Sequence, residues 1–248
     1  MQSPISTNTL LNNRYRLVKI LGQGGFGRTY LAEDQGRFNE LCAIKELIPN
    51  QEPDYLVEKS KELFQREAST LYQIQHPQIP QFRATFEENG RLFLVRDYVE
   101  GKTLAALLQE RQTQGQVFQE AEVRTLLEQL LPVLAYIHSK GIIHRDISPD
   151  NIILSQPSPD QNAIPILIDF GVVKELATRF QSPEGGTPAT TVGKLGYSPS
   201  EQIQMGQVYP SSDLYSLAVT AVVLLTGKDP RELFDAVQLS WQWRRWTT

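Results

Sequence analysis

Cysteine is nearly absent from this chain, which has one, Cys42, among 248 residues. A single cysteine cannot form an internal disulfide, so we expect a protein of a reducing, cytoplasmic environment. Long hydrophobic runs are missing as well. The longest, residues 217–225, is interrupted by Thr220 and falls far short of the ~20 apolar residues that cross a bilayer. The first residues also lack the basic and apolar regions of a signal peptide, so we expect no transmembrane segment in this chain.

An excess of positive charge is also lacking, because 24 Lys and Arg stand against 28 Asp and Glu and the net charge is -4. This balance argues against nucleic acid or an anionic membrane as a general partner, and any phosphate site has to be local. What the chain does have is an ordinary globular composition, with 40% hydrophobic and 21% charged residues. The length suits one large domain or two modest lobes.

The order of hydrophobic patterns predicts an α+β protein in three parts. Residues 1–13 are polar and small and indicate a flexible leader. Residues 14–99 show mainly strand patterns with one helix near residues 58–75, and residues 100–248 are mainly helical. Glu67 lies on the apolar stripe of that first helix, where a carboxylate is costly unless it is paired.

A polar loop between two Ile-rich segments is the first candidate for chemistry. Residues 141–154 hold Asp146 and, five residues later, Asn151, between flanks typical of buried strands. Taken alone, the loop also fits an ordinary hairpin turn, since Pro-Asp-Asn is common in turns. A run of glycines at residues 22–27 lies between two predicted strands. The dinucleotide-binding fingerprint needs a helix after its glycines, so that type of site is excluded.

Further short motifs occur in one order on the expected element types, and each is weak alone. They are the glycine loop of residues 21–29, Cys42-Ala-Ile-Lys45, Glu67, His144-Arg145-Asp146 with Asn151, Asp169-Phe170-Gly171, Tyr197-Ser-Pro-Ser-Glu201, and Asp213 at the start of an apolar helix. Together, over about Arg14 to Phe234, they resemble a bacterial eukaryotic-like (Hanks-type) Ser/Thr protein kinase. The residues within the motifs look like those of cyanobacterial members. The resemblance implies a bilobal protein-kinase fold, with a small β-rich N-lobe that contains one αC helix and a mainly helical C-lobe.

The resemblance also implies an enzyme that transfers the γ-phosphoryl group of ATP to Ser or Thr of a protein substrate, with Mg²⁺. Asp146 would accept the proton of the substrate hydroxyl, and Lys45, paired with Glu67, would hold the α- and β-phosphates. Asn151 and Asp169 would bind the metal. The remaining nucleotide contacts would come from the glycine loop, the adenine pocket and the hinge, namely Leu21, Gly22, Gln23, Gly24, Gly25, Phe26, Gly27, Thr29, Ala43, Asp97, Val99 and Ile153.

Some positions depart from the family pattern. Ser148 stands where Ser/Thr kinases of this family carry the lysine that neutralises the γ-phosphate, and Lys194 stands where they carry threonine. We hypothesise that the Lys194 ammonium replaces the missing lysine in catalysis; a solvated lysine is the alternative. Arg96, just before the hinge, needs a partner and could weaken the Lys45–Glu67 pair by binding Glu67.

Two histidines have expected structural roles. His144 is expected to brace the catalytic loop, and His138 to lie at a helix surface or cap. The family's C-lobe normally continues through further helices, so this C-lobe is expected to be incomplete at its C-terminal end.

Regulation is also suggested by the sequence. Arg145 beside the catalytic Asp suggests control by phosphorylation of the activation loop. The favoured sites are Thr190 and Thr191, followed by Thr187 and Ser182.

A pseudokinase, a nucleotide-binding or protein-binding scaffold without turnover, is the main alternative. Ser148, Arg96 and the short C-lobe favour it, whereas the intact catalytic and metal-binding set argues against it. A small-molecule phosphotransferase of related fold is a weaker option, because such enzymes commonly lack the long activation segment. The sequence identifies neither the protein substrate nor the oligomeric state.

Overall fold

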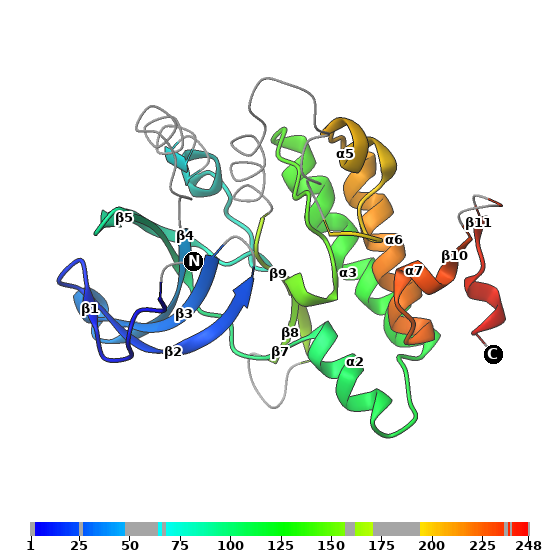
Figure 1. The fold of residues 1–248 in the computed structure, drawn as a ribbon, viewed down its shortest axis with the longest axis horizontal. Coiled ribbons are helices and arrows are strands. Elements are labelled where there is room, and N and C mark those ends of the chain that lie inside the picture. Colours follow the sequence, from blue (N-terminus) through cyan, green and yellow to red (C-terminus); the bar gives the residue numbers. More distant parts are fainter. Residues whose placement is uncertain are drawn as a thin grey trace. The chain divides into compact units, whose positions relative to one another are not determined.

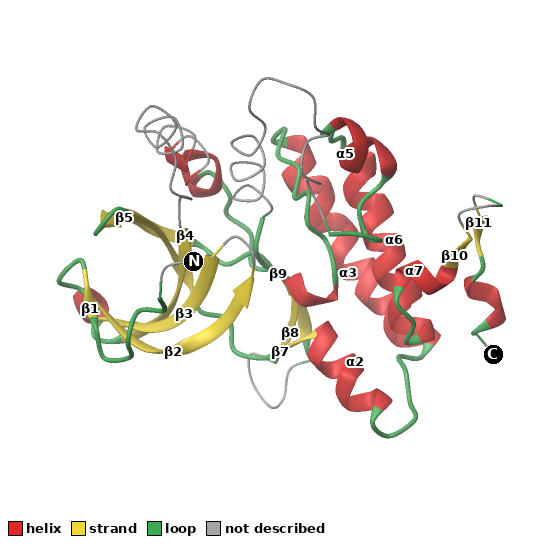
Figure 2. Ribbon diagram, in the orientation of Figure 1, coloured by secondary structure: helices red, strands yellow, loops and turns green. Residues whose placement is uncertain are grey.

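The computed structural model describes residues 3–24, 27–47, 64–65, 68–156, 162–170, 194–235, 238 and 240–247. They form two compact units, and the division between them falls between Val99 and Glu100. Most elements of the two units are labelled in Figure 1. Figure 2 shows that strands dominate the first unit, here the strand-rich unit, and helices the second, here the helical unit. The predicted α+β composition is therefore confirmed.

The strand-rich unit is built on a six-stranded sheet with the order β1-β2-β3-β4-β6-β5, whose neighbouring strands are all antiparallel. Alternation of apolar residues along these strands gives one buried face, on which Tyr15, Leu17, Tyr30, Ile44 and Phe93 form the core. The strands are β1 (Leu10–Leu11), β2 (Tyr15–Gly24), β3 (Gly27–Asp34), β4 (Glu40–Leu47), β5 (Phe82–Glu88) and β6 (Arg91–Asp97), with the short helix η1 (Gln35–Arg37) between β3 and β4.

The start of the chain belongs to this sheet, so the prediction of a flexible leader is wrong for residues 3–13. Strand β1 pairs with β2, and before it the Asn8 N–H donates to the Leu17 carbonyl at 2.8 Å. Leu11 is 3% exposed and Ile5 packs against the same core. Isolated apolar residues in a polar stretch give no periodic signal, and only the open sheet face shows where they bind.

Asp34, at the end of β3, is a fully buried carboxylate. It accepts two hydrogen bonds from Arg14, at 2.6 and 2.9 Å, and one from the Gly36 N–H at 3.1 Å. Burial raises the pKa of this carboxyl, but the hydrogen bonds from Arg14 and Gly36 and the charges of Arg14 and Arg83 outweigh burial, so its pKa lies below the ordinary value.

This pKa predicts an acid-sensitive contribution to stability. A lowered folded-state pKa means that the Asp34 pair stabilises the fold above the unfolded-state pKa of about 3.9, and that this stabilisation is lost as pH falls through the folded-state pKa. We expect the difference in the free energy of unfolding between wild type and Asp34→Asn to be largest near neutral pH and to shrink as acid protonates the carboxylate. Urea unfolding between about pH 7 and about pH 3 measures it, and a constant difference would contradict the prediction.

The described residues of the helical unit include a three-stranded antiparallel sheet, β7-β8-β9, a two-stranded antiparallel sheet and a set of packed helices. Its helices are α2 (Leu104–Gln112), α3 (Glu120–Ser139), α5 (Ser200–Met205), α6 (Pro210–Thr226) and α7 (Pro230–Leu233), with the short helices η2 (Pro149–Asn151) and η3 (Trp243–Arg245). Its strands are β7 (Lys102–Thr103), β8 (Ile152–Ser155), β9 (Ile164–Leu167) and the separate pair β10 (Phe234–Asp235) and β11 (Ser240–Trp241).

Helix α6 is buried along most of its length and packs against α3. It begins with Pro210, whose missing N–H costs little at a helix start. It ends before Gly227, whose left-handed φ of 66° lets its N–H donate to the Val223 carbonyl at 2.8 Å. Within the described ranges, no helix has both the length and the apolar composition that crossing a membrane requires.

Candidate active site

The loop that carries Asp146 is held by a buried carboxylate of helix α6. Asp213 accepts a hydrogen bond from the His144 backbone N–H through Oδ2, at 2.9 Å, and one from the Arg145 N–H through Oδ1, at 2.8 Å. The Asp213 side chain is 1% exposed. Arg145 has a φ of 70°, a conformation that non-glycine residues keep only where their surroundings impose it. Asp213 therefore fixes the backbone immediately before Asp146.

His138, in the last turn of α3, belongs to the same network, so the predicted surface position of its side chain is wrong, whereas its predicted place at the helix end holds. Its Nε2 lies 2.8 Å from Asp213 Oδ2, and its side chain is 14% exposed. The two residues are 75 positions apart in the chain. Spacing along one helix cannot reveal a partner at that distance in the sequence.

His144 braces the loop from its other side, in line with its expected structural role. Its ring is fully buried, with its centroid 4.5 Å from that of Phe170, and Nε2 lies 3.0 Å from the Ile168 carbonyl. A carbonyl only accepts, so Nε2 carries the proton and Nδ1 accepts from the Asp146 N–H at 3.4 Å. Burial lowers the pKa of His144, which favours this neutral form.

Asp146 and Asn151 meet inside the loop. Asn151 Nδ2 donates to the backbone carbonyl of Asp146 and to its carboxylate Oδ2, both at 2.7 Å. Asp146 is 6% exposed and Asn151 9% exposed, so the pair lies largely out of water. Since the amide nitrogen is used by Asp146, the Asn151 Oδ1 oxygen is the atom available to a ligand.

Asp169 is tied to this pair through its neighbours. The Ile168 N–H donates to the Asn151 carbonyl at 2.9 Å, and Phe170 packs on His144. Asp169 itself has a φ of 56°, again in the left-handed region. The Asp169 carboxylate and the Asn151 amide oxygen are hard donors of the kind that Mg²⁺ prefers, and Mg²⁺ commonly takes few protein ligands together with waters and phosphates. These donors therefore fit the predicted metal.

Ser148 and Lys194 are two of the departures from the family pattern. Ser148 is fully buried, and its hydroxyl has no hydrogen-bond partner among the residues that the structure describes. The Lys194 ammonium forms an ion pair with the exposed carboxylate of Asp150 and lies 4.8 Å from the Tyr197 ring centroid. Asp150 belongs to η2 together with Asn151, so the ammonium is bound to the catalytic loop. A catalytic role for Lys194 stays a prediction.

Gln202 of α5 is a supporting residue that the sequence did not point to. It is fully buried, and its Nε2 donates to the Arg145 carbonyl at 2.8 Å. Gln202 and Asp213 thus hold the carbonyl and the N–H of the same strained residue. The sequence does indicate a role for Asp213, because a carboxylate in an apolar helix needs a polar partner if it is buried. Gln202 offers no such signal.

The predicted phosphate loop is the turn between β2 and β3. Gly24 pairs with Gly27 where the two strands end. Gly27 has a φ of 149°, and a side chain there would collide with the Glu46 backbone carbonyl, so this position requires glycine. The rest of the loop comprises Leu21, Gly22 and Gln23 on β2, Thr29 on β3, and Gly25 and Phe26 outside the described residues.

Cross-strand register places Thr29, Ala43 and Lys45 on one face of the sheet. Thr29 is opposite Lys45, and Ala43 lies two positions before Lys45 on β4. Arg96 of β6 is opposite Ala43 and shares that face. Glu67 lies outside the described residues, so its pairing with Lys45 and the effect of Arg96 on that pairing stay predictions.

The predicted hinge begins at the last residue of β6. The Asp97 N–H donates to the Gln81 carbonyl at 2.9 Å, so the carbonyl is the backbone group that Asp97 can offer to a base. Val99 follows just before the division between the units. Ile153, the remaining predicted adenine contact, lies on β8 in the helical unit.

A sheet with a glycine hairpin and a strand lysine, followed by a helical unit in which Asp and Asn share one loop and Asp-Phe-Gly follows a strand, defines the protein kinase class. The chain belongs to the protein kinase domain family, whose pattern it matches over residues 15–242. The resemblance seen in the motifs is confirmed.

The relatives include kinases of cyanobacteria. The chain is 48% identical over 228 residues to serine/threonine-protein kinase PknA of Nostoc sp. and 44% identical over 228 residues to serine/threonine-protein kinase C of Synechocystis sp.. Each comparison covers 90% of this chain, which spans 39% and 41% of the lengths of these relatives.

Solved kinase structures share the fold. The PpkA-294 apo form matches 92% of this chain and 80% of its own, with a TM-score of 0.70 and 26% identity. The Mycobacterium tuberculosis PknI kinase domain matches 92% of this chain and 79% of its own, with a TM-score of 0.66 and 25% identity. The predicted protein-kinase fold is confirmed.

Proposed function

We propose that this chain is an ATP-dependent protein kinase that phosphorylates Ser or Thr of protein substrates and requires Mg²⁺. The observation that carries the proposal is the buried Asp146–Asn151 pair, in a loop whose backbone Asp213 holds in place. Pro149 in the loop and the names of the relatives support Ser/Thr over Tyr as the acceptor. The single, buried Cys42 fits work in a reducing, cytoplasmic environment.

Each side chain has one task in this proposal. Asn151 orients the Asp146 carboxylate, which accepts the proton of the substrate hydroxyl and directs it for in-line attack. Lys45 binds the α- and β-phosphates, and its partner is Glu67. Mg²⁺, held by Asn151 Oδ1 and the Asp169 carboxylate, supplies the positive charge that neutralises the phosphates.

The direct test is transfer of label from γ-labelled ATP. The purified chain with Mg²⁺ should label itself or a general Ser/Thr substrate such as casein, and hydrolysis of the product should release phosphoserine or phosphothreonine. Absence of transfer, together with measurable ATP binding, would instead support a nucleotide-binding pseudokinase. Ser148 is the observation that favours this second candidate, because its small buried side chain leaves the γ-phosphate without the usual lysine.

Control by phosphorylation is a further part of the proposal. The Arg145 guanidinium, beside the catalytic Asp, is a suitable partner for a phosphate on the activation segment. Thr190 and Thr191 are the favoured acceptors, and both lie outside the described residues. Phosphopeptide mapping after incubation with Mg-ATP identifies the sites.

The hypothesis about Lys194 gives a measurable prediction. If its ammonium stabilises the transferring phosphoryl group, Lys194→Ala should lower kcat by about 10²-fold, and Lys194→Arg should retain much of the activity. Lys140→Ala is the matched control, because Lys140 also lies over a tyrosine ring of the helical unit, at 5.2 Å. An unchanged kcat for Lys194→Ala would leave Lys194 only the role of neutralising Asp150.

A further inference from the structure

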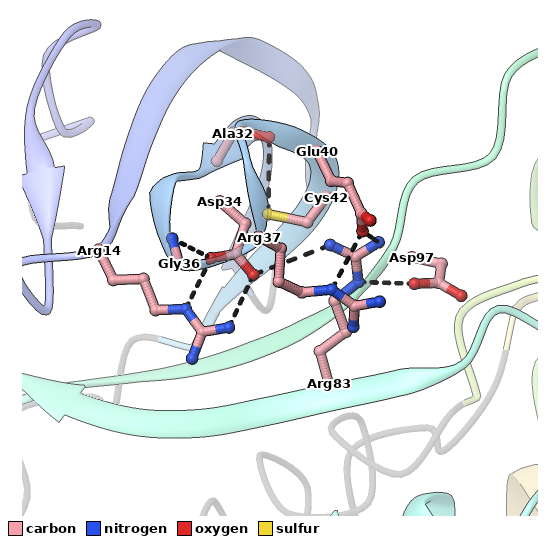
Figure 3. Close-up of polar contacts among 9 residues, drawn as sticks. All are labelled: Arg14, Ala32, Asp34, Gly36, Arg37, Glu40, Cys42, Arg83 and Asp97. Atoms are coloured by element: carbon pink, nitrogen blue, oxygen red, sulfur yellow. Dashed lines mark hydrogen bonds and ion pairs between the residues drawn. The ribbon is translucent and has the colours of Figure 1, made fainter.

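Arg83 of β5 connects three carboxylates of the strand-rich unit (Figure 3). Its Nε donates to Asp97 Oδ1 at 2.6 Å, and its Nη2 donates to Glu40 Oε2 at 3.1 Å. Its Nη1 lies 3.9 Å from Asp34 Oδ2. The Arg83 side chain is only 9% exposed, so its charge is compensated by these partners rather than by water.

The position of the Arg83 guanidinium is therefore fixed by its surroundings. Asp34, its most buried neighbour, is held by the two hydrogen bonds from Arg14 and the one from Gly36. The planar guanidinium can meet several acceptors only in one orientation. Arg83 thus links the buried Asp34 at the end of β3 to Asp97 at the end of β6.

Asp97 is fixed at two points. Arg83 binds its carboxylate, and the Gln81 carbonyl accepts from its N–H at 2.9 Å. Asp97 is the last residue of β6, and no regular element follows it before the division between the units after Val99. The two contacts hold the Asp97 N–H and its side chain on either side of Cα, and so restrict the backbone torsions from which its carbonyl takes its direction.

We propose that Arg83 is a positioning residue for nucleotide recognition: by holding the Asp97 carboxylate, it aims the Asp97 carbonyl at the 6-amino group of adenine. The proposal rests on the proposed kinase function, in which Asp97 contacts the base. Arg83 touches no part of the nucleotide in this scheme, and its effect on binding passes through Asp97. Loss of Arg83 should therefore weaken recognition of the base and leave the chemical step unaltered.

The test compares Arg83→Met with Arg37→Met in the whole chain. Arg37 also pairs with Glu40, at 3.1 Å, but it is 49% exposed, and Figure 3 draws no hydrogen bond or ion pair between it and Asp97. We expect Arg83→Met to raise the KM for ATP by about 3–10-fold, the effect of one misaligned hydrogen bond, with kcat changed by less than about twofold. Arg37→Met should leave both constants unchanged. Arg83→Lys should resemble Arg83→Met, because one ammonium cannot bind all three carboxylates.

A nucleotide without the 6-amino group separates positioning from general damage. Purine riboside triphosphate lacks the group that the Asp97 carbonyl would bind, so Arg83→Met should not weaken its binding, whereas destabilisation of the whole unit would weaken both nucleotides. An equal loss for both, or an unchanged KM for ATP, overturns the proposal.

If Arg83→Met does not fold, Asp97→Ala removes the acceptor of the Arg83 Nε hydrogen bond and tests the same link from its other end. The Asp97 side chain is 37% exposed and tolerates substitution more easily. Asp97→Ala should show the same selective loss for ATP, and a loss equal for both nucleotides overturns the proposal. Failure of the proposed function is a different result: the wild-type chain would then bind no ATP or transfer no phosphate.

Discussion

Asp146→Asn should lower phosphate transfer by about 10²–10⁴-fold, because the amide cannot accept the proton of the substrate hydroxyl. The substitution keeps the size of the side chain. In the wild type, Asn151 Nδ2 donates to Asp146 Oδ2 at 2.7 Å, and the amide oxygen of the variant can still accept this hydrogen bond. The loop should therefore keep its shape, and the affinity for ATP should stay near that of the wild type. The loss should fall on kcat and leave the KM for ATP almost unchanged.

The measurement is kcat with γ-labelled ATP, together with ADP binding and thermal unfolding of both proteins. Equal phosphate incorporation by wild type and Asp146→Asn would mean that the chain has no kinase activity of its own, and the pseudokinase alternative would stand. Loss of ADP binding in the variant would instead show that the loop has collapsed, which the isosteric change is designed to avoid.

Asp213→Asn should destabilise the helical unit by about 3–5 kcal/mol and abolish activity with it. Both carboxylate oxygens of Asp213 accept from backbone N–H groups, those of His144 and Arg145, and Oδ2 also lies 2.8 Å from His138 Nε2. An amide has one oxygen, so its NH₂ group must face one of these N–H donors. The donors are buried, and a buried unsatisfied polar group carries its full desolvation cost.

Asp229→Asn is the matched control for this change. Asp229 also lies at the start of a helix in the same unit, but it is 41% exposed and its partner Arg231 is 68% exposed. Asn caps a helix about as well as Asp, and exposed ion pairs contribute about 0–1 kcal/mol, so we expect a small effect. Urea unfolding of both variants checks the contrast. Equal free energies of unfolding for the two variants would show that the hydrogen bonds of Asp213 do not stabilise the catalytic loop.

Much of the candidate site was predictable because its residues stand at short, fixed spacings. Asp146 and Asn151 are five positions apart, and the structure brings them into direct hydrogen-bond contact. The glycine hairpin was predicted from strands on both sides of the glycines, and β2 and β3 confirm it. The partners of Asp213 were not predictable, since each lies about 70 positions away in the chain.

The sequence by itself determined the element types, the order of the motifs and the family, because hydrophobic periodicity and short spacings are local properties of the chain. Only the tertiary structure decided that Leu10–Leu11 form the edge strand of the sheet, that His138 and Gln202 support the catalytic loop, and that Arg83 holds Asp97. Each of these contacts depends on which side chains and backbone groups from distant segments the fold buries next to one another. Charges and unpaired donors are tolerated there only with the right partner, and that partner is chosen by the fold.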